Sequence, residues 1–304
     1  MRSEIPVLRD AGLKLVREFG FLQDRHKATG LPYAQTHILL EVGSRPLLGV
    51  NELAEILNLE LSGASRHVTS LVNDGLLKFN KDPKDRRKKP LTVTAAGTKT
   101  LRRLHDTATD QVDAALALMR PEETAVVTRG LVAYSRALQH VRMQKDIVIR
   151  PIKRADNDAM ASIIVSVMGS FGAVGEGYSI EDAEVRAMYE AYRGPRSRYF
   201  VVDRQGVVVG GGGVARLAGG KANTCELKKM YFLPEARGIG LGQRMLQECL
   251  SAARELKYTQ MYLETLEHMG DAIRLYEGFG FRRLAAPLGN TGHHNTDRWY
   301  VLTL

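Results

Sequence analysis

Residues 225–246 read CELKKMYFLPEARGIGLGQRML and contain the pattern that decides the fold of the second half of the chain. Glu226 to Leu233 form a run typical of a β-strand, and Pro234 ends that run. The glycine-rich segment Arg237–Gly242 then opens a helix. Its three glycines leave backbone N–H groups uncovered at the positive end of the helix dipole, so the stretch predicts a site for phosphate groups in an α/β fold.

The spacing of the glycines distinguishes between kinds of phosphate site. A nucleotide-binding P-loop needs Lys followed by Ser or Thr after its last glycine, and neither follows Gly242. The dinucleotide fingerprint needs a third glycine that is missing after Gln243, and the segment also occurs late in its domain. Arg237, Gly240 and Gly242 instead fit the pattern Gln/Arg-x-x-Gly-x-Gly/Ala.

A second motif, AIRLYEGFGF at residues 272–281, follows a strand predicted at Met261–Glu264. Together with the glycine segment, this helix ending in Tyr-Glu-x-x-Gly-Phe resembles the GNAT acetyltransferase superfamily, over residues 147–304. The resemblance implies an α/β fold with a central mixed sheet, acetyl-CoA as co-substrate, an amine as acetyl acceptor and no metal. It also implies coenzyme contacts from Arg237, Gly238, Ile239, Gly240, Leu241 and Gly242.

Acetyl transfer to an amine needs a base, because an alkylammonium with a pKa of about 10 has no free lone pair at neutral pH. Glu226 is the candidate general base, since the resemblance implies that its strand diverges from its neighbour beside the acetyl group. In the alternative interpretation, Glu226 pairs with Lys228 or another surface cation.

The resemblance also assigns to Tyr276 the protonation of the departing thiolate. The alternative is a tyrosine at a helix end that only packs beside Phe279 and Phe281. Three further residues are expected to offer backbone groups to the acetyl carbonyl and the pantetheine arm; these are Met230, Tyr231 and Phe232.

The acceptor side of the site is less defined by the sequence. Residues 292–300, GHHNTDRWY, precede or enter the last strand, where the resemblance places the acceptor pocket. The adjacent His293 and His294 would point to opposite faces of a strand, which argues against a metal site. Arg298 is a candidate for holding an acceptor carboxylate.

The first half of the chain is predominantly helical in its pattern. Within residues 57–76, LNLELSGASRHVTSLVNDGL, a break at Asn58–Leu61 separates two helices. The second helix is expected to have Ser62 as its N-cap and to stop at Gly75. Two short strand-like runs follow, and residues 78–89 around the turn between them hold seven basic side chains against two aspartates. Such a helix-turn-helix with a basic hairpin indicates contact with a polyanion.

Residues 5–143 resemble the MarR family of winged helix-turn-helix regulators. The most specific stretches are the helix Ser62–Asn73 and the wing motif Asp85-Arg86-Arg87, followed by Val93-Thr94 and Gly97. The resemblance implies a mainly α DNA-binding domain and a homodimer formed through the first and last two helices. Such a dimer would bind a palindromic operator in double-stranded DNA.

The DNA contacts that the resemblance implies agree with the chemistry of the side chains. Hydroxyls and an arginine near a helix N-terminus can reach base edges and phosphates, and an arginine fits a narrow minor groove. For His67, contact with a phosphate or only with solvent is an alternative. Pro90 removes a ladder donor from the returning strand of the wing. The implied contacts are Ser62, Ser65, Arg66 and His67 on the helix and Arg87 in the wing.

Composition limits the class of protein. The 304 residues are 44% hydrophobic and 25% charged, as is typical of soluble globular proteins, and the net charge is +9. We expect a cytoplasmic protein without a membrane partner, because the sequence shows neither a signal peptide nor an apolar span. Cys225 and Cys249 are expected to be reduced packing residues.

Two domains are predicted, residues 1–146 and 147–304, divided where a strand-like run follows Asp146. The leading hypothesis is a bifunctional transcriptional regulator and N-acetyltransferase that acts on a small-molecule amine or a protein lysine. In one alternative the GNAT domain is a non-catalytic sensor of acetyl-CoA or an amine, which the presence of Glu226 and Tyr276 argues against. In another the winged helix only dimerises, which the basic wing argues against.

Overall fold

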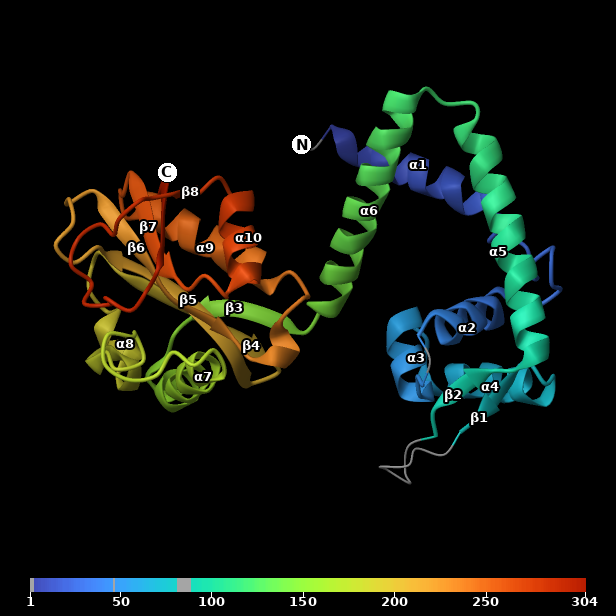
Figure 1. The fold of residues 1–304 in the computed structure, drawn as a ribbon, viewed down its shortest axis with the longest axis horizontal. Coiled ribbons are helices and arrows are strands. Elements are labelled where there is room, and N and C mark those ends of the chain that lie inside the picture. Colours follow the sequence, from blue (N-terminus) through green and yellow to red (C-terminus); the bar gives the residue numbers. More distant parts are fainter. Residues whose placement is uncertain (1–2, 46, 81–88) are drawn as a thin grey trace. The chain divides into compact units, whose positions relative to one another are not determined.

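The computed structural model describes residues 3–45, 47–80 and 89–304. The chain divides into two compact units, Met1–Val127 and Thr128–Leu304, which are described one at a time (Figure 1). The domain boundary expected after Asp146 stays a prediction. Helix α6 (Pro121–Met143) begins in the first unit and ends in the second, and strand β3 begins at Ile147.

The first unit is mainly helical with a two-stranded antiparallel hairpin, as predicted. Its elements before α6 are α1 (Glu4–Glu18), α2 (Tyr33–Ser44), α3 (Val50–Leu57), α4 (Leu61–Asn73), β1 (Leu77–Phe79), β2 (Leu91–Val93) and α5 (Ala95–Leu116). Its core gathers apolar side chains from α2 to α5, namely Ile38, Leu39, Val42, Leu53, Val68, Leu71, Leu77, Leu91 and Leu104.

Helices α3 and α4 form the predicted helix-turn-helix. Asn58 ends α3 in the left-handed conformation, and Gly75, with φ of 69°, follows the end of α4 as expected. The predicted N-cap Ser62 is wrong, because Glu60 holds that position. The Ala64 N–H donates to the Glu60 carbonyl at 2.9 Å, so the first helical hydrogen bond already encloses Ser62.

The hairpin joins α5 through a close approach at Gly97. A Cβ there would lie 2.2 Å from the carbonyl oxygen of Leu76, so only glycine fits. Thr94 caps α5 by accepting the Gly97 N–H at 3.0 Å. Pro90 precedes β2, and its carbonyl accepts the Asn80 N–H at 2.7 Å. The threonine and glycine of the wing motif therefore fix the base of the hairpin.

Helices α1, α5 and α6 leave many apolar side chains exposed to solvent in the monomer. Neither α1 nor α6 buries a residue, and α5 buries only Gly97 and Leu104. The exposed apolar side chains on these helices include Ile5, Val7, Leu8, Leu13, Val112, Val126, Leu131, Val132, Leu138 and Val141.

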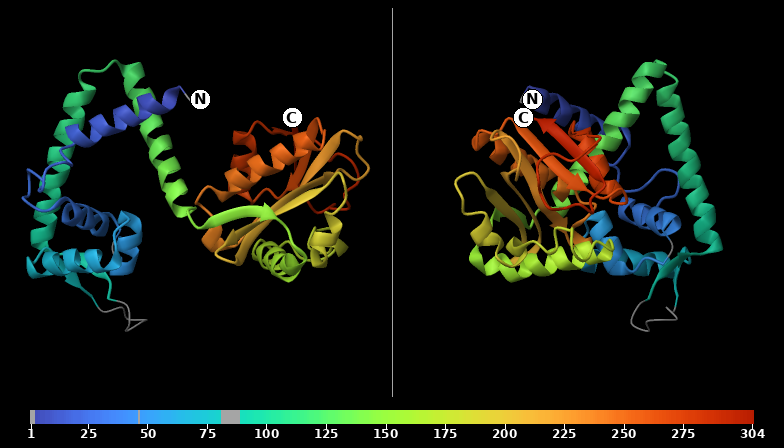
Figure 2. Two further views of the ribbon diagram at one scale, coloured as in Figure 1. Left: turned by 180° about the vertical axis from the view of Figure 1, so that it is seen from behind. Right: turned by 60° about the vertical axis from the view of Figure 1, so that its left-hand side comes forward.

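The second unit is a seven-stranded sheet with helices on both faces (Figure 2). Its elements after α6 are β3 (Ile147–Pro151), η1 (Arg154–Asp156), α7 (Asn157–Ser170), η2 (Ala183–Arg186), α8 (Met188–Ala191), β4 (Arg198–Arg204), β5 (Val207–Arg216), β6 (Thr224–Phe232), η3 (Pro234–Ala236), α9 (Leu241–Glu255), β7 (Gln260–Thr265), α10 (Gly270–Gly278), β8 (Arg282–Arg283) and β9 (Arg298–Thr303).

The sheet has the order β3-β4-β5-β6-β7-β9-β8. Strands β6 and β7 are parallel and the other pairs are antiparallel, which confirms the predicted mixed sheet. One core packs α9 and α10 against the sheet and another packs α7 and α8. The register of β5 on β6 shifts between Gly211 and Gly213, so β5 has an irregularity within the glycine run of residues 210–213.

Candidate functional site

Strands β6 and β7 diverge near the middle of the sheet and open a cleft between them. Their parallel pairing stops at Glu226 and Tyr262, although both strands continue. A cleft of about 760 Å³ lies there, bounded by the ends of these strands, the glycine segment and α10. Its volume falls in the range of sites for small molecules and cofactors.

The glycine segment has the conformation that the sequence predicts. Gly240 is the N-cap of α9 with φ of 80°, a left-handed conformation that a larger side chain would strain. Gly240 and Gly242 both line the cleft, so the uncovered amides of the first turn of α9 lie at its wall. Arg237 also lines it, and its Nε donates to the Phe232 carbonyl at 2.9 Å. These donors and the helix dipole fit the phosphate groups of coenzyme A.

Glu226 is buried at the last residue pair before the strands diverge. Its exposed fraction is 5%, and it lines the cleft. Burial raises the pKa of this carboxyl to about 7; the nearby Lys228 lowers it and Glu264 raises it. Lys228 itself pairs with Glu184, with 2.9 Å between Nζ and Oε1. A carboxylate with a pKa near 7 is suited to accept a proton at neutral pH.

A second carboxylate in the cleft, Glu264, is already engaged with neighbouring donors. It accepts hydrogen bonds from the hydroxyls of Tyr262 at 2.7 Å and Thr291 at 3.0 Å. The His293 Nδ1 lies 3.2 Å from its Oε2, and the Thr296 hydroxyl lies 3.4 Å away. Glu226 is therefore better placed than Glu264 to take a proton from a substrate.

Tyr276 lines the cleft from the last turns of α10. Its ring packs against Phe281 with centroids 5.8 Å apart, so the packing role considered from the sequence is present. Burial raises the pKa of its phenol well above the usual range. The phenol thus stays protonated at neutral pH and is able to act as a proton donor.

The backbone beyond Glu226 is shaped by an irregularity at Lys229. This residue has φ of 53°, and the Tyr199 hydroxyl donates to its carbonyl at 2.7 Å. Beyond the divergence, the edge of β6 that faces β7 is unpaired by any of the described strands. Backbone groups there are available to a ligand, and the residues that line the cleft at this edge are Met230, Tyr231 and Phe232.

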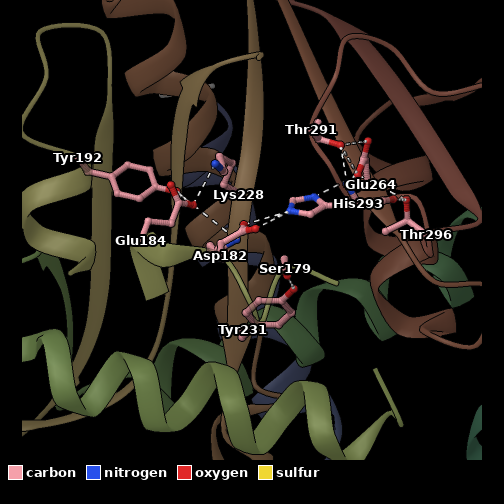
Figure 3. A network of polar contacts seen from close by, with 11 residues as sticks. Ser179, Asp182, Glu184, Tyr192, Lys228, Tyr231, Glu264, Thr291, His293 and Thr296 are labelled. Carbon is pink, nitrogen blue, oxygen red and sulfur yellow. Dashed lines mark hydrogen bonds and ion pairs between the residues drawn. The ribbon is translucent and has the colours of Figure 1, made fainter. Parts of the chain in front are cut away.

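A network of polar side chains (Figure 3) includes residues that line the cleft, among them Glu264 and His293. The His293 Nε2 lies 3.0 Å from Asp182 Oδ2, while its Nδ1 faces Glu264. The buried Lys229 forms a second ion pair with Asp182. Burial lowers the pKa of His293, but the bonds to the two carboxylates outweigh it and raise the pKa to about 9. Asp182 has its pKa lowered to about 2 by His293 and Lys229 in spite of its own burial.

Sequence reasoning missed this network. It placed His293 on a strand, whereas the residue lies in the loop before β9. Asp182 lies 111 residues earlier in the chain, and no local pattern connects the two. Arg298, the candidate for an acceptor carboxylate, pairs with Glu267 and is not among the residues that line the cleft.

In the first unit, α4 turns the predicted DNA-contacting side chains away from the core. Its buried residues are Ala64, Val68 and Leu71. The side chains on the other face include Ser62, Ser65 and Arg66, which are exposed, and His67, which is half-buried. Arg87 lies outside the described residues, so its contact stays a prediction.

No helix among the described residues is long and apolar enough to cross a membrane. No group of three or more His, Cys, Asp or Glu side chains in the same part of the chain could hold a metal ion.

Comparisons with known proteins agree with this architecture. Residues 166–281 match the acetyltransferase (GNAT) family and residues 29–88 match the MarR family. The chain is 41% identical over 147 residues to the uncharacterized N-acetyltransferase YjgM of Escherichia coli K12, over 48% of this chain and 88% of that protein. It is 28% identical over 138 residues to the uncharacterized HTH-type transcriptional regulator YfiV of Bacillus subtilis 168, over 45% of this chain and 82% of that protein.

Among solved structures, a GNAT superfamily phosphinothricin acetyltransferase from Sinorhizobium meliloti, in complex with acetyl-CoA, aligns with 52% of this chain and 89% of its own. The TM-score is 0.43 and the sequence identity 20%.

The second half of the molecule is thus an acetyltransferase domain of the GNAT kind, and through it the chain belongs to the GNAT family. Its first half is similar to regulators of the MarR family, whose model matches residues 29–88. The protein is a fusion of a MarR-like region with a GNAT domain, which confirms the two resemblances found in the sequence.

Proposed function

We propose that this protein is a transcriptional regulator and an acetyl-CoA-dependent N-acetyltransferase in one chain. The observation that carries the enzymatic half is the buried Glu226 at the divergence of β6 and β7, in one cleft with the glycine segment and Tyr276. The acceptor is an amine of a small molecule or of a protein lysine.

The residues of the cleft account for both proton transfers of the reaction. The co-substrate supplies an acetyl group activated as a thioester. Glu226 takes the proton of the acceptor ammonium, directly or through a water molecule, and so frees the attacking lone pair. Tyr276 gives a proton to the thiolate that leaves.

Backbone groups hold the reacting carbonyl and the coenzyme. N–H groups of Met230, Tyr231 or Phe232 stabilise the negative charge that develops on the carbonyl oxygen. The phosphates rest on the start of α9. The residues proposed to hold them are Arg237, Gly238, Ile239, Gly240, Leu241 and Gly242.

The first unit is proposed to bind double-stranded DNA as a homodimer. Exposed apolar faces on α1, α5 and α6 support a dimer, because a single chain leaves these side chains in water. A two-fold dimer presents two copies of α4 to a palindromic operator. The proposed DNA contacts are Ser62, Ser65, Arg66, His67 and Arg87.

The deciding experiment is consumption of acetyl-CoA by the full-length protein against a panel of amines, amino acids, polyamines and lysine peptides. Turnover that disappears in Glu226→Gln supports the enzyme and identifies the acceptor class. Acetyl-CoA binding without turnover on any amine would favour the alternative function as a sensor. Absence of acetyl-CoA binding would contradict both.

A further inference from the structure

The end of α6 and the residues after it are fixed to the glycine segment within the second unit. The Gln144 Nε2 donates to the Ile239 carbonyl at 2.6 Å. Arg244, in the first turn of α9, donates to the carbonyl of Ile147 at 3.2 Å and to the Gln144 Oε1 at 3.4 Å. These bonds attach the residues that directly follow α6 to the glycine segment and to the start of α9.

One turn before Gln144, a histidine lies directly over the glycine segment. A Cβ built on Gly240 would come within 2.6 Å of the His140 Nδ1. The imidazole therefore occupies the space beside the first amides of α9. His140 is half-buried, and it lines the cleft.

Arg136 precedes His140 by four residues, so the two side chains lie on the same face of α6. Arg136 is exposed, and it too lines the cleft that contains Gly238 and Gly242. Both residues belong to the second unit, and both precede the residues 166–281 that match the GNAT family.

The charges around the glycine segment favour an anion with more than one phosphate. Arg237 and Arg274 line the cleft together with Arg136 and His140. Asp271, an acidic group that also lines it, is paired with Arg274. The carboxyl end of the α6 dipole repels an anion, so any attraction from this helix must come from its side chains.

We propose that Arg136 and His140 bind the phosphate groups of coenzyme A. This inference rests on the proposed binding of acetyl-CoA in the cleft. It adds to the acetyltransferase domain a coenzyme contact from the helix that precedes it, a helix whose first turns belong to the other unit. Guanidinium and imidazole N–H groups donate to phosphate oxygens, and arginine can do so with two parallel bonds.

The test compares ligands with and without phosphates on the full-length protein. Dissociation constants of coenzyme A and of pantetheine, which lacks every phosphate, are measured by calorimetry for the wild type, Arg136→Gln and His140→Ala. Arg129→Gln is the matched control, since Arg129 lies on the same helix but is not among the residues lining the cleft.

We expect each cleft variant to bind coenzyme A roughly tenfold more weakly and pantetheine as the wild type does, with Arg129→Gln unchanged. Unchanged binding of coenzyme A by both variants would overturn the inference. An equal loss for both ligands would overturn it as well, because it would report damage to the fold. A wild type that binds neither ligand would instead refute the proposed function itself.

Discussion

The candidate functional side chains of the two units lie in opposite surroundings. On α4 the candidate DNA contacts Ser62 and Arg66 project into solvent from a helix whose other face is buried. In the second unit Glu226 and Tyr276 are at most 6% exposed. A duplex is a preformed polyanion that exposed side chains can reach, whereas acetyl transfer needs groups whose protonation is set by removal from water. In the second unit, burial therefore adjusts the protonation of the candidate catalytic groups. In the first unit, burial only holds the helix that presents the candidate DNA contacts.

The largest loss of activity is expected from a substitution at Glu226, the buried candidate base. Glu226→Gln keeps the shape of the side chain and removes the base, so turnover on the acceptor should fall by roughly a hundredfold or more at neutral pH. In the wild type, kcat/KM should rise with pH through about 7, because the carboxylate form is the active one. The loss of turnover in Glu226→Gln should become smaller at high pH, because more of the acceptor amine is already deprotonated there.

Glu248→Gln is the control for this measurement. Glu248 is exposed on α9 and is not among the residues that line the cleft. Steady-state rates of both variants are measured between pH 6 and 10. They distinguish loss of the catalytic base from the general effect of removing one negative charge from the domain. Equal rates for Glu226→Gln and the wild type would remove Glu226 from catalysis.

Tyr276→Phe is expected to have the next largest effect. The substitution keeps the ring that packs against Phe281 and deletes the proton donor, so kcat should fall about tenfold or more while the KM for acetyl-CoA changes little. Initial rates with a good acceptor give both constants. An unchanged kcat would leave Tyr276 with its packing role alone.

The same contrast explains what the sequence could predict. The helix-turn-helix, the glycine segment and Glu226 lie in continuous stretches where periodicity or spacing has local meaning. The N-cap of α4 was placed two residues late because serine is the better capping residue, whereas Glu60 takes that position. The contact between Asp182 and His293, and that between His140 and Gly240, join segments about a hundred residues apart. Only the tertiary fold brings these distant segments of the chain together.

A third prediction concerns the stability of the network around His293. Its folded pKa of about 9 lies above the unfolded value of 6.5, so its contribution is fully present below pH 6.5 and is lost as the pH rises through 9. His293→Asn should therefore lower the free energy of unfolding by about 1 to 3 kcal/mol at pH 6, and by much less above pH 9.5.

The single tryptophan, Trp299 on β9, makes the measurement specific to the second unit. Urea unfolding followed by its fluorescence gives the free energy at each pH. His294→Asn is the matched control, because the neighbouring His294 is exposed. A pH-independent difference between His293→Asn and the wild type would show that the imidazole is not held as a cation.

The smallest effect is expected in the first unit, at the proposed DNA contact Arg87. Arg87→Ala removes one proposed contact with the DNA backbone or minor groove, so binding to duplex DNA should weaken by about 1 kcal/mol. The slope of the logarithm of the affinity against that of the salt concentration should fall by about one phosphate equivalent. Fluorescence anisotropy between roughly 50 and 200 mM salt measures both quantities. Arg254→Ala, which removes an exposed charge from α9, should change neither. If Arg87→Ala also changes neither, Arg87 does not contact DNA, and the proposed DNA contacts are those of α4 alone.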